Sequence, residues 1–76
     1  MKAMKTPPVG ENISEIRKVI GVSPEALARR ITENGGRLSG RQIRRIEDGD
    51  SQASIEALTL IAGALGVTVQ RLFQES

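Results

Sequence analysis

Residues 38–49 read Leu38-Ser-Gly-Arg-Gln-Ile-Arg-Arg-Ile-Glu-Asp-Gly49, and this stretch predicts a short helix over about residues 40–48. Ser39 is a favoured N-cap, and Gln42 three residues later completes the pattern of a capping box. Gly49 can end the helix in a left-handed conformation. Both ends of the helix are therefore marked by local residues.

The same helix has two chemically different sides. At about 100° per residue, Ile43 and Ile46 share one side. Arg41 and Arg45, four residues apart, fall on the opposite side, with Arg44 on the flank. A helix that is anchored by two isoleucines and presents three arginines to solvent is suited to an anionic groove.

Positive charge is concentrated in one part of the chain. The 76 residues carry a net charge of only +2, but residues 29–45 hold six arginines and one acid, Glu33, which amounts to +5. The remainder holds five basic and eight acidic residues, or −3. Such asymmetry is typical of a nucleic-acid binder. Charge alone also fits a solvated helix face.

Composition argues against several classes of protein. The chain has no cysteine and no histidine, and Phe73 is its only aromatic residue. We therefore expect no enzyme activity, no metal and no cofactor, and no aromatic platform for single-stranded nucleic acid. No apolar run approaches the roughly 20 residues of a membrane span. We expect one soluble, cytoplasmic domain that has no membrane partner.

The apolar spacing predicts an all-α, compact five-helix bundle over residues 11–76, after a flexible leader over residues 1–10. We expect the first helix to run from about Asn12, as its cap, to Ile20. The second starts after Ser23, the fourth after Ser54 and the fifth after Thr68, while Gly66 ends the fourth. Besides Ile43 and Ile46, the side chains expected to point inward are Ile13, Ile16, Ile20, Leu27, Ala28, Ile31, Ile55, Leu58, Ala62, Leu65, Val69, Leu72 and Phe73.

Several short motifs stand in a familiar order along residues 13–73. They are Arg17, Gly21-Val-Ser23, Leu27-Ala28, Ser39, the block Ile43–Gly49 and the block Ser54–Val67. In this order and at nearly this spacing, the chain resembles the phage repressor and Cro-like helix-turn-helix domains, also called the XRE family. The resemblance implies that the helix at residues 40–48 is a recognition helix, which lies in the major groove of DNA.

The resemblance also implies roles for individual residues. Gly40, Arg41, Gln42 and Arg45 match the positions that reach bases in relatives. Arg41 and Arg45 would bond to guanine, and Gln42 would read adenine.

Other positions match the DNA backbone contacts of the family. Ser23, Ser39 and Arg44 would contact phosphates, Ser23 together with the first amides of its helix. Arg37, in the segment between the second and third helices, would add a further backbone contact. A further pair is structural. Glu47 lies on the core side of its helix, and the family pattern pairs it with Arg17.

The chain departs from the family pattern between the second and third helices. Relatives have four or five residues between the Leu-Ala pair and the cap, whereas ten residues separate Ala28 from Ser39. The extra segment, residues 32–37, must lengthen the second helix or form a bulging turn. Asp50 stands where a basic residue is common, which should weaken phosphate binding.

Taken together, these patterns predict a sequence-specific, double-stranded DNA-binding regulator of transcription, a repressor encoded by a prokaryote or phage. We expect a homodimer on a palindromic operator, with residues 67–76 as the dimer contact. The alternative is a protein-interaction module on the same scaffold, such as an antitoxin or an adaptor, because a fold does not determine a function.

Overall fold

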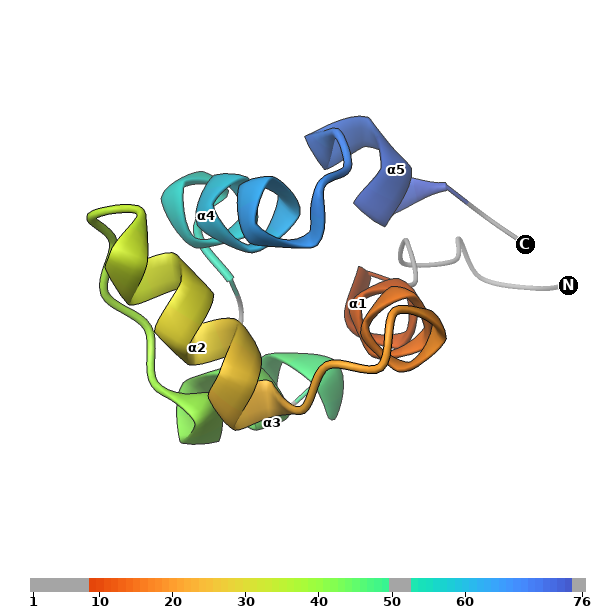
Figure 1. Cartoon of the computed structure of the whole chain (residues 1–76). Coiled ribbons are helices and arrows are strands. Elements are labelled where there is room, and N and C mark those ends of the chain that lie inside the picture. Colours follow the sequence, from red (N-terminus) through yellow and green to blue (C-terminus); the bar gives the residue numbers. More distant parts are fainter. Residues whose placement is uncertain (1–8, 50–52, 75–76) are drawn as a thin grey trace, which may run out of the picture.

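Five α-helices make up the regular structure of this chain in a computed structural model, which describes residues 9–49 and 53–74 (Figure 1). The helices are α1 (Val9–Val19), α2 (Pro24–Glu33), α3 (Gly40–Glu47), α4 (Ile55–Leu65) and α5 (Val69–Phe73). The expectation of an all-α, five-helix fold is therefore confirmed. Within the two described ranges, no helix is both long and apolar enough to cross a membrane.

Four helices begin where their capping residues predict. The side-chain oxygen of each cap accepts a hydrogen bond from the amide three residues later, at 3.0–3.2 Å; the caps are Ser23, Ser39, Ser54 and Thr68. Pro24 occupies the first position of α2, where its missing N–H costs nothing. These helix starts need no tertiary contact, because the capping group lies within one turn of its partner.

The start of α1 differs from the expectation. The helix begins at Val9, three residues before the expected cap at Asn12, so Val9 and Gly10 belong to the folded bundle and not to a leader. The rest of the expected leader, residues 1–8, lies outside the described residues.

Asn12 is a buried anchor and not a helix cap. It lies inside α1 with only 4% of its surface exposed. Its Nδ2 donates hydrogen bonds to the carbonyl oxygens of Leu72 at 2.8 Å and Gln74 at 2.6 Å. The prediction was wrong because an asparagine near a helix start looks like a cap in sequence, whereas its acceptors here lie 60 and 62 residues further along the chain.

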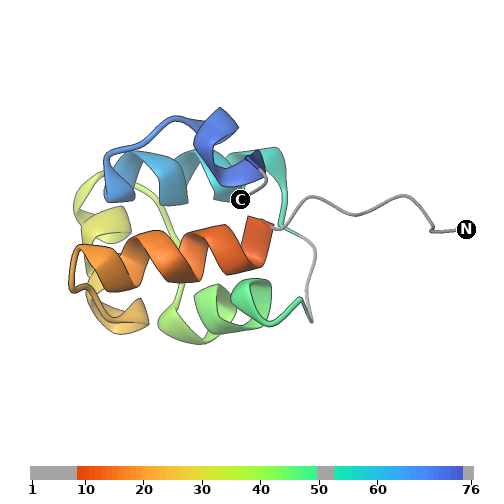
Figure 2. The same ribbon diagram turned by 90° about the vertical axis from the view of Figure 1, so that its right-hand side faces the viewer.

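The helices close around one aliphatic core. Helix α2 packs against α3 and α4, while α1 packs against α3 and α5, and α4 packs against α5 (Figures 1 and 2). Every helix contributes at least one fully buried side chain. Burying one such aliphatic side chain stabilises the fold by about 1.5–3 kcal/mol. The fully buried side chains are Ile13, Leu27, Ile31, Ile43, Ile61 and Leu72.

Three apolar side chains expected inside the core are partly or largely exposed. The exposed fraction is 43% for Ile20, 67% for Ile55 and 38% for Phe73. Each lies at a helix end, where neighbouring helices no longer cover the side. Helical periodicity groups residues on one side but does not say how far along the helix that side is covered. Conversely, Ile61 is fully buried although it was not assigned to the stripe of α4.

The connection between α2 and α3 combines both expected solutions. Helix α2 continues to Glu33, and the chain then turns at Gly35, whose φ of +91° favours glycine. The Gly36 amide donates to the Ile31 carbonyl at 2.9 Å, which closes the helix end. A Cβ on Gly36 would lie only 2.6 Å from Leu60 Cδ2, so this loop packs tightly on α4.

Candidate nucleic-acid interface

Helix α3 separates its apolar and cationic residues as its sequence predicts. Ile43 is fully buried and Ile46 is 8% exposed, so both anchor the helix in the core. Arg41, Arg44 and Arg45 are exposed. The core thus sets which side of α3 faces outward, and that side carries three positive charges.

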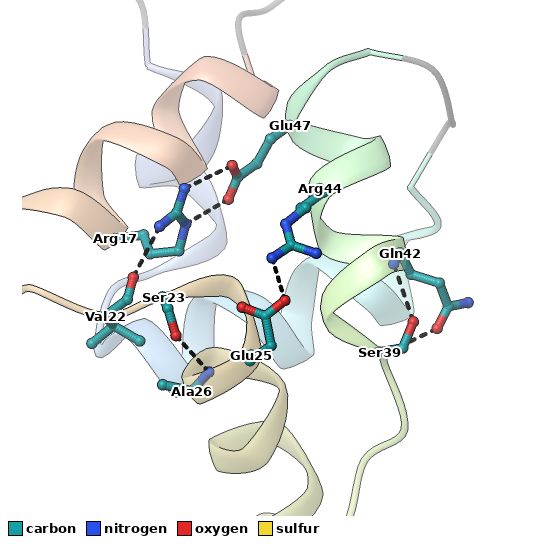
Figure 3. A network of polar contacts seen from close by, with 9 residues as sticks. All are labelled: Arg17, Val22, Ser23, Glu25, Ala26, Ser39, Gln42, Arg44 and Glu47. Carbon is teal, nitrogen blue, oxygen red and sulfur yellow. Dashed lines mark hydrogen bonds and ion pairs between the residues drawn. The ribbon is translucent and has the colours of Figure 1, made fainter.

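The N-terminus of α3 is held by a reciprocal pair of hydrogen bonds. The Gln42 amide N–H donates to Ser39 Oγ at 3.1 Å, and the Ser39 amide N–H donates to Gln42 Oε1 at 2.9 Å (Figure 3). The predicted capping box is therefore present. As a consequence, the bond from the Ser39 amide to Oε1 holds the Gln42 side chain against the first turn of the helix.

Helix α2 brings an acidic side chain beside α3. Glu25 forms an ion pair with Arg44, and a Cβ added to Gly40 would lie 3.1 Å from Glu25 Oε2 (Figure 3). The two charged side chains are 51% and 56% exposed. A pair this exposed contributes no more than about 1 kcal/mol. The sequence indicated only that Glu25 suits the first turn of its own helix.

The C-terminus of α3 is fastened to α1 by the predicted ion pair. Arg17 Nε donates to Glu47 Oε2 at 2.8 Å and Nη2 donates to Oε1 at 3.0 Å (Figure 3). A third bond runs from Arg17 Nη1 to the Val22 carbonyl at 3.0 Å. The side chains are only 12% and 9% exposed. Hydrogen bonding to Glu47 raises the pKa of Arg17 above its usual value, so the guanidinium stays charged.

A glycine that sequence reasoning assigned to the leader also supports this end of α3. A Cβ on Gly10 would lie 2.6 Å from the carbonyl oxygens of both Ile46 and Glu47. The clash would be with backbone, which cannot swing aside. No local signal identifies this glycine, because its neighbour is a helix distant in sequence.

The candidate phosphate contacts come from three elements. Ser23 lies at the start of α2 and Arg37 is exposed in the loop between α2 and α3, while Ser39 and Arg44 belong to the cap and flank of α3. In the first turn of α2, Pro24 has no N–H, and the Ala26 and Leu27 amides already donate to Ser23. Only the Glu25 amide is left there for an anion. This helix start therefore offers less than a typical phosphate site.

No protein-family model, curated protein or solved structure gives a significant match to this chain. The functional proposal therefore depends on the site itself. Among residues 9–49 and 53–74, no three acidic side chains are grouped so that they could hold a metal ion. What α3 presents is positive charge and hydrogen-bond donors. Asp50, expected to oppose phosphate binding, lies outside the described residues.

Proposed function

We propose that this protein is a sequence-specific, double-stranded DNA-binding regulator of transcription, with α3 as the helix that enters the major groove. The observation that carries the proposal is the two-sided character of α3. Ile43 and Ile46 anchor it in the core, while Arg41, Arg44 and Arg45 extend from its exposed surface. A helix of this kind fits the width of the major groove and complements its phosphate walls.

The contacts that fix both ends of α3 to the rest of the domain support the same proposal. The capping box holds its first turn, and the Arg17–Glu47 pair holds its last turn to α1. A reading helix that is already ordered before binding loses little conformational freedom on DNA, so more of its contact energy appears as affinity. Helix α2, the loop at residues 34–39 and α3 would then act as the helix-turn-helix unit of a repressor or Cro-like domain.

Arg41 and Arg45 are the residues proposed to read bases. Their guanidinium groups can each donate two hydrogen bonds to O6 and N7 of guanine. Arg37, Arg44 and the serine caps would contact phosphates and set the register on the duplex. Arg44 must leave Glu25 to do so, which costs little because the pair is half-exposed.

We further propose that two copies bind a palindrome and repress by occupying promoter DNA. A single module of this size buries a modest area on DNA, so useful specificity requires two half-sites about one helical turn, roughly 34 Å, apart. Within the expected dimer segment, Leu72 is fully buried in its own domain. Phe73, 38% exposed, is the most exposed apolar side chain of α5 and the one best placed to contact a second copy.

Selection of bound duplexes from a random DNA pool tests the proposal. We expect enrichment of a palindrome, which fluorescence anisotropy would then show to bind more tightly than random DNA, with affinity falling steeply as salt rises. The double variant Arg41→Glu, Arg45→Glu should abolish binding while circular dichroism shows an unchanged fold.

Lys18→Glu is the matched control, because Lys18 is exposed on α1 and is assigned neither a DNA contact nor a dimer contact. It should retain more of the affinity than either charge reversal on α3. If no sequence is enriched, or if the double variant binds DNA as the wild type does, the proposal is wrong. A protein partner lost only in the double variant would instead favour the interaction-module alternative.

A further inference from the structure

We infer that Gln42 selects a base that shows acceptors and no amino group in the major groove, guanine or thymine. It discriminates against the adenine that a free glutamine would read, because adenine has a donor, N6, beside its N7 acceptor. This inference rests on the proposed function, because it concerns which DNA sequence α3 recognises. It follows from how the capping box orients the side-chain amide of Gln42.

The orientation of this amide is determined by its partner. The Ser39 backbone N–H can only donate, so the atom that meets it at 2.9 Å must be the acceptor, Oε1. The donor, Nε2, is consequently the other end of the amide. Figure 3 shows Nε2 of Gln42 pointing away from the helix, on the side opposite the bond to Ser39.

Glutamine reads adenine by using both ends of its amide at once. Oε1 accepts from the adenine N6 amino group while Nε2 donates to N7. In this protein, that geometry would require Gln42 to turn Oε1 outward and give up its bond to the Ser39 amide. With the capping box intact, Gln42 offers the groove a donor alone.

The neighbouring side chains strengthen this bias. Arg41 and Arg45 carry donors and no acceptor. Glu25, an acidic side chain that lies beside the start of α3, is paired with Arg44. The exposed part of α3 therefore presents donors, which match O6 and N7 of guanine and O4 of thymine. The amino groups of cytosine and adenine would face further donors.

The substitution Gln42→Glu tests the inference while keeping the capping box. Glutamate is also favoured at this position, where one carboxylate oxygen can accept from the Ser39 amide. The second oxygen then replaces Nε2, so an outward donor becomes an outward acceptor. In duplex selection, one position of each half-site should change from guanine or thymine to cytosine, whose N4 amino group donates to a carboxylate.

A second variant and a control make the result specific. Gln42→Met removes the amide, so the preference of guanine or thymine over adenine at that position, about fivefold or more in the wild type, should fall to near equality. Thr59→Glu makes the same change in net charge at an exposed position of α4, outside α3 and outside the expected dimer segment, and should leave every base preference unchanged. Thermal melts monitored by circular dichroism would verify that each variant is folded.

The outcomes separate this inference from the proposed function. If the wild type selects adenine at the position that the Gln42 variants alter, the inference is overturned although DNA reading stands. If neither Gln42 variant alters any position, Gln42 reads no base and the inference is again overturned. If the wild type enriches no sequence at all, the proposed function fails and the inference fails with it.

Discussion

Removing Arg17 should destabilise this protein more than removing any exposed arginine. Its guanidinium makes two hydrogen bonds to Glu47, at 2.8 and 3.0 Å, and a third to the Val22 carbonyl at 3.0 Å. Arg17→Ala would leave the Glu47 carboxylate, 9% exposed, without its cation. Breaking a buried pair from one side costs about 3–5 kcal/mol, and this largely buried pair should approach that loss, because the remaining charge is unpaired and poorly solvated.

This loss is large compared with the stability of so small a domain. At about 0.05–0.15 kcal/mol per residue, a chain of 76 residues has a free energy of unfolding of about 4–11 kcal/mol. For a domain of this size each kcal/mol shifts Tm by about 4–8 °C, so we expect Tm to fall by about 12–40 °C. Arg17→Lys keeps the charge but loses the bidentate hydrogen bonding to Glu47. Its Tm should lie between those of the wild type and Arg17→Ala.

Urea unfolding followed by far-ultraviolet circular dichroism is the suitable assay, because the chain has no tryptophan or tyrosine. A double-mutant cycle with Glu47→Gln would isolate the coupling between the two side chains. Glu25→Gln is the matched control. It breaks a half-exposed pair and should change the free energy of unfolding by less than about 1 kcal/mol.

The pH dependence follows from the sign of the pKa shift. Because the pKa of Arg17 is raised in the folded state, the stability linked to its protonation is complete below the usual arginine value and is lost only above it. The deficit of Arg17→Ala should thus be the same at neutral pH and at moderately alkaline pH. A deficit below about 1 kcal/mol, typical of an exposed pair, would refute this reasoning.

Four other predictions concern the stability of the fold and the DNA contact. Asn12→Ala should lower the free energy of unfolding by about 1–3 kcal/mol, because two carbonyls at the end of α5 lose their donor; wild-type stability in urea would contradict this. Gly63→Ala should raise stability by about 0.5–1 kcal/mol, since alanine is the better helix former and the added Cβ meets no atom within 4 Å in the last turn of α4. Gly10→Ala should lower stability by about 1–3 kcal/mol through its backbone clash, so equal melting temperatures for the two glycine variants would be incompatible with the structure. Arg44→Ala should reduce the slope of log affinity against log salt by about 0.9 for each DNA-bound copy, whereas an unchanged slope would mean that Arg44 touches no phosphate.

Local structure was largely predictable from the sequence. Ser23, Ser39, Ser54 and Thr68 all cap helices as expected, and Gly66 ends α4 with a φ of +78°. These features are readable because each depends on hydrogen bonds within about one turn of helix. The inward side of α3 was predictable for a similar reason, since its two isoleucines lie three residues apart.

The predictions that were wrong concern residues whose surroundings are set by helices distant in the sequence. Asn12 looked like a cap and Gly10 like part of a leader, although both contact elements distant in sequence. Ile55 follows the apolar spacing of α4 but is 67% exposed, because no other helix covers that end.

The sequence by itself therefore determined the presence of the five helices, the starts of α2 to α5 and the cationic side of α3, because propensity, capping and periodicity act over a few residues. Only the tertiary structure decided that Asn12 ties α1 to α5 and that Glu25 lies beside Gly40 and Arg44. It also decided which apolar helix ends stay uncovered. These features depend on the packing of helices that are far apart in the chain, and no local pattern specifies which surfaces meet.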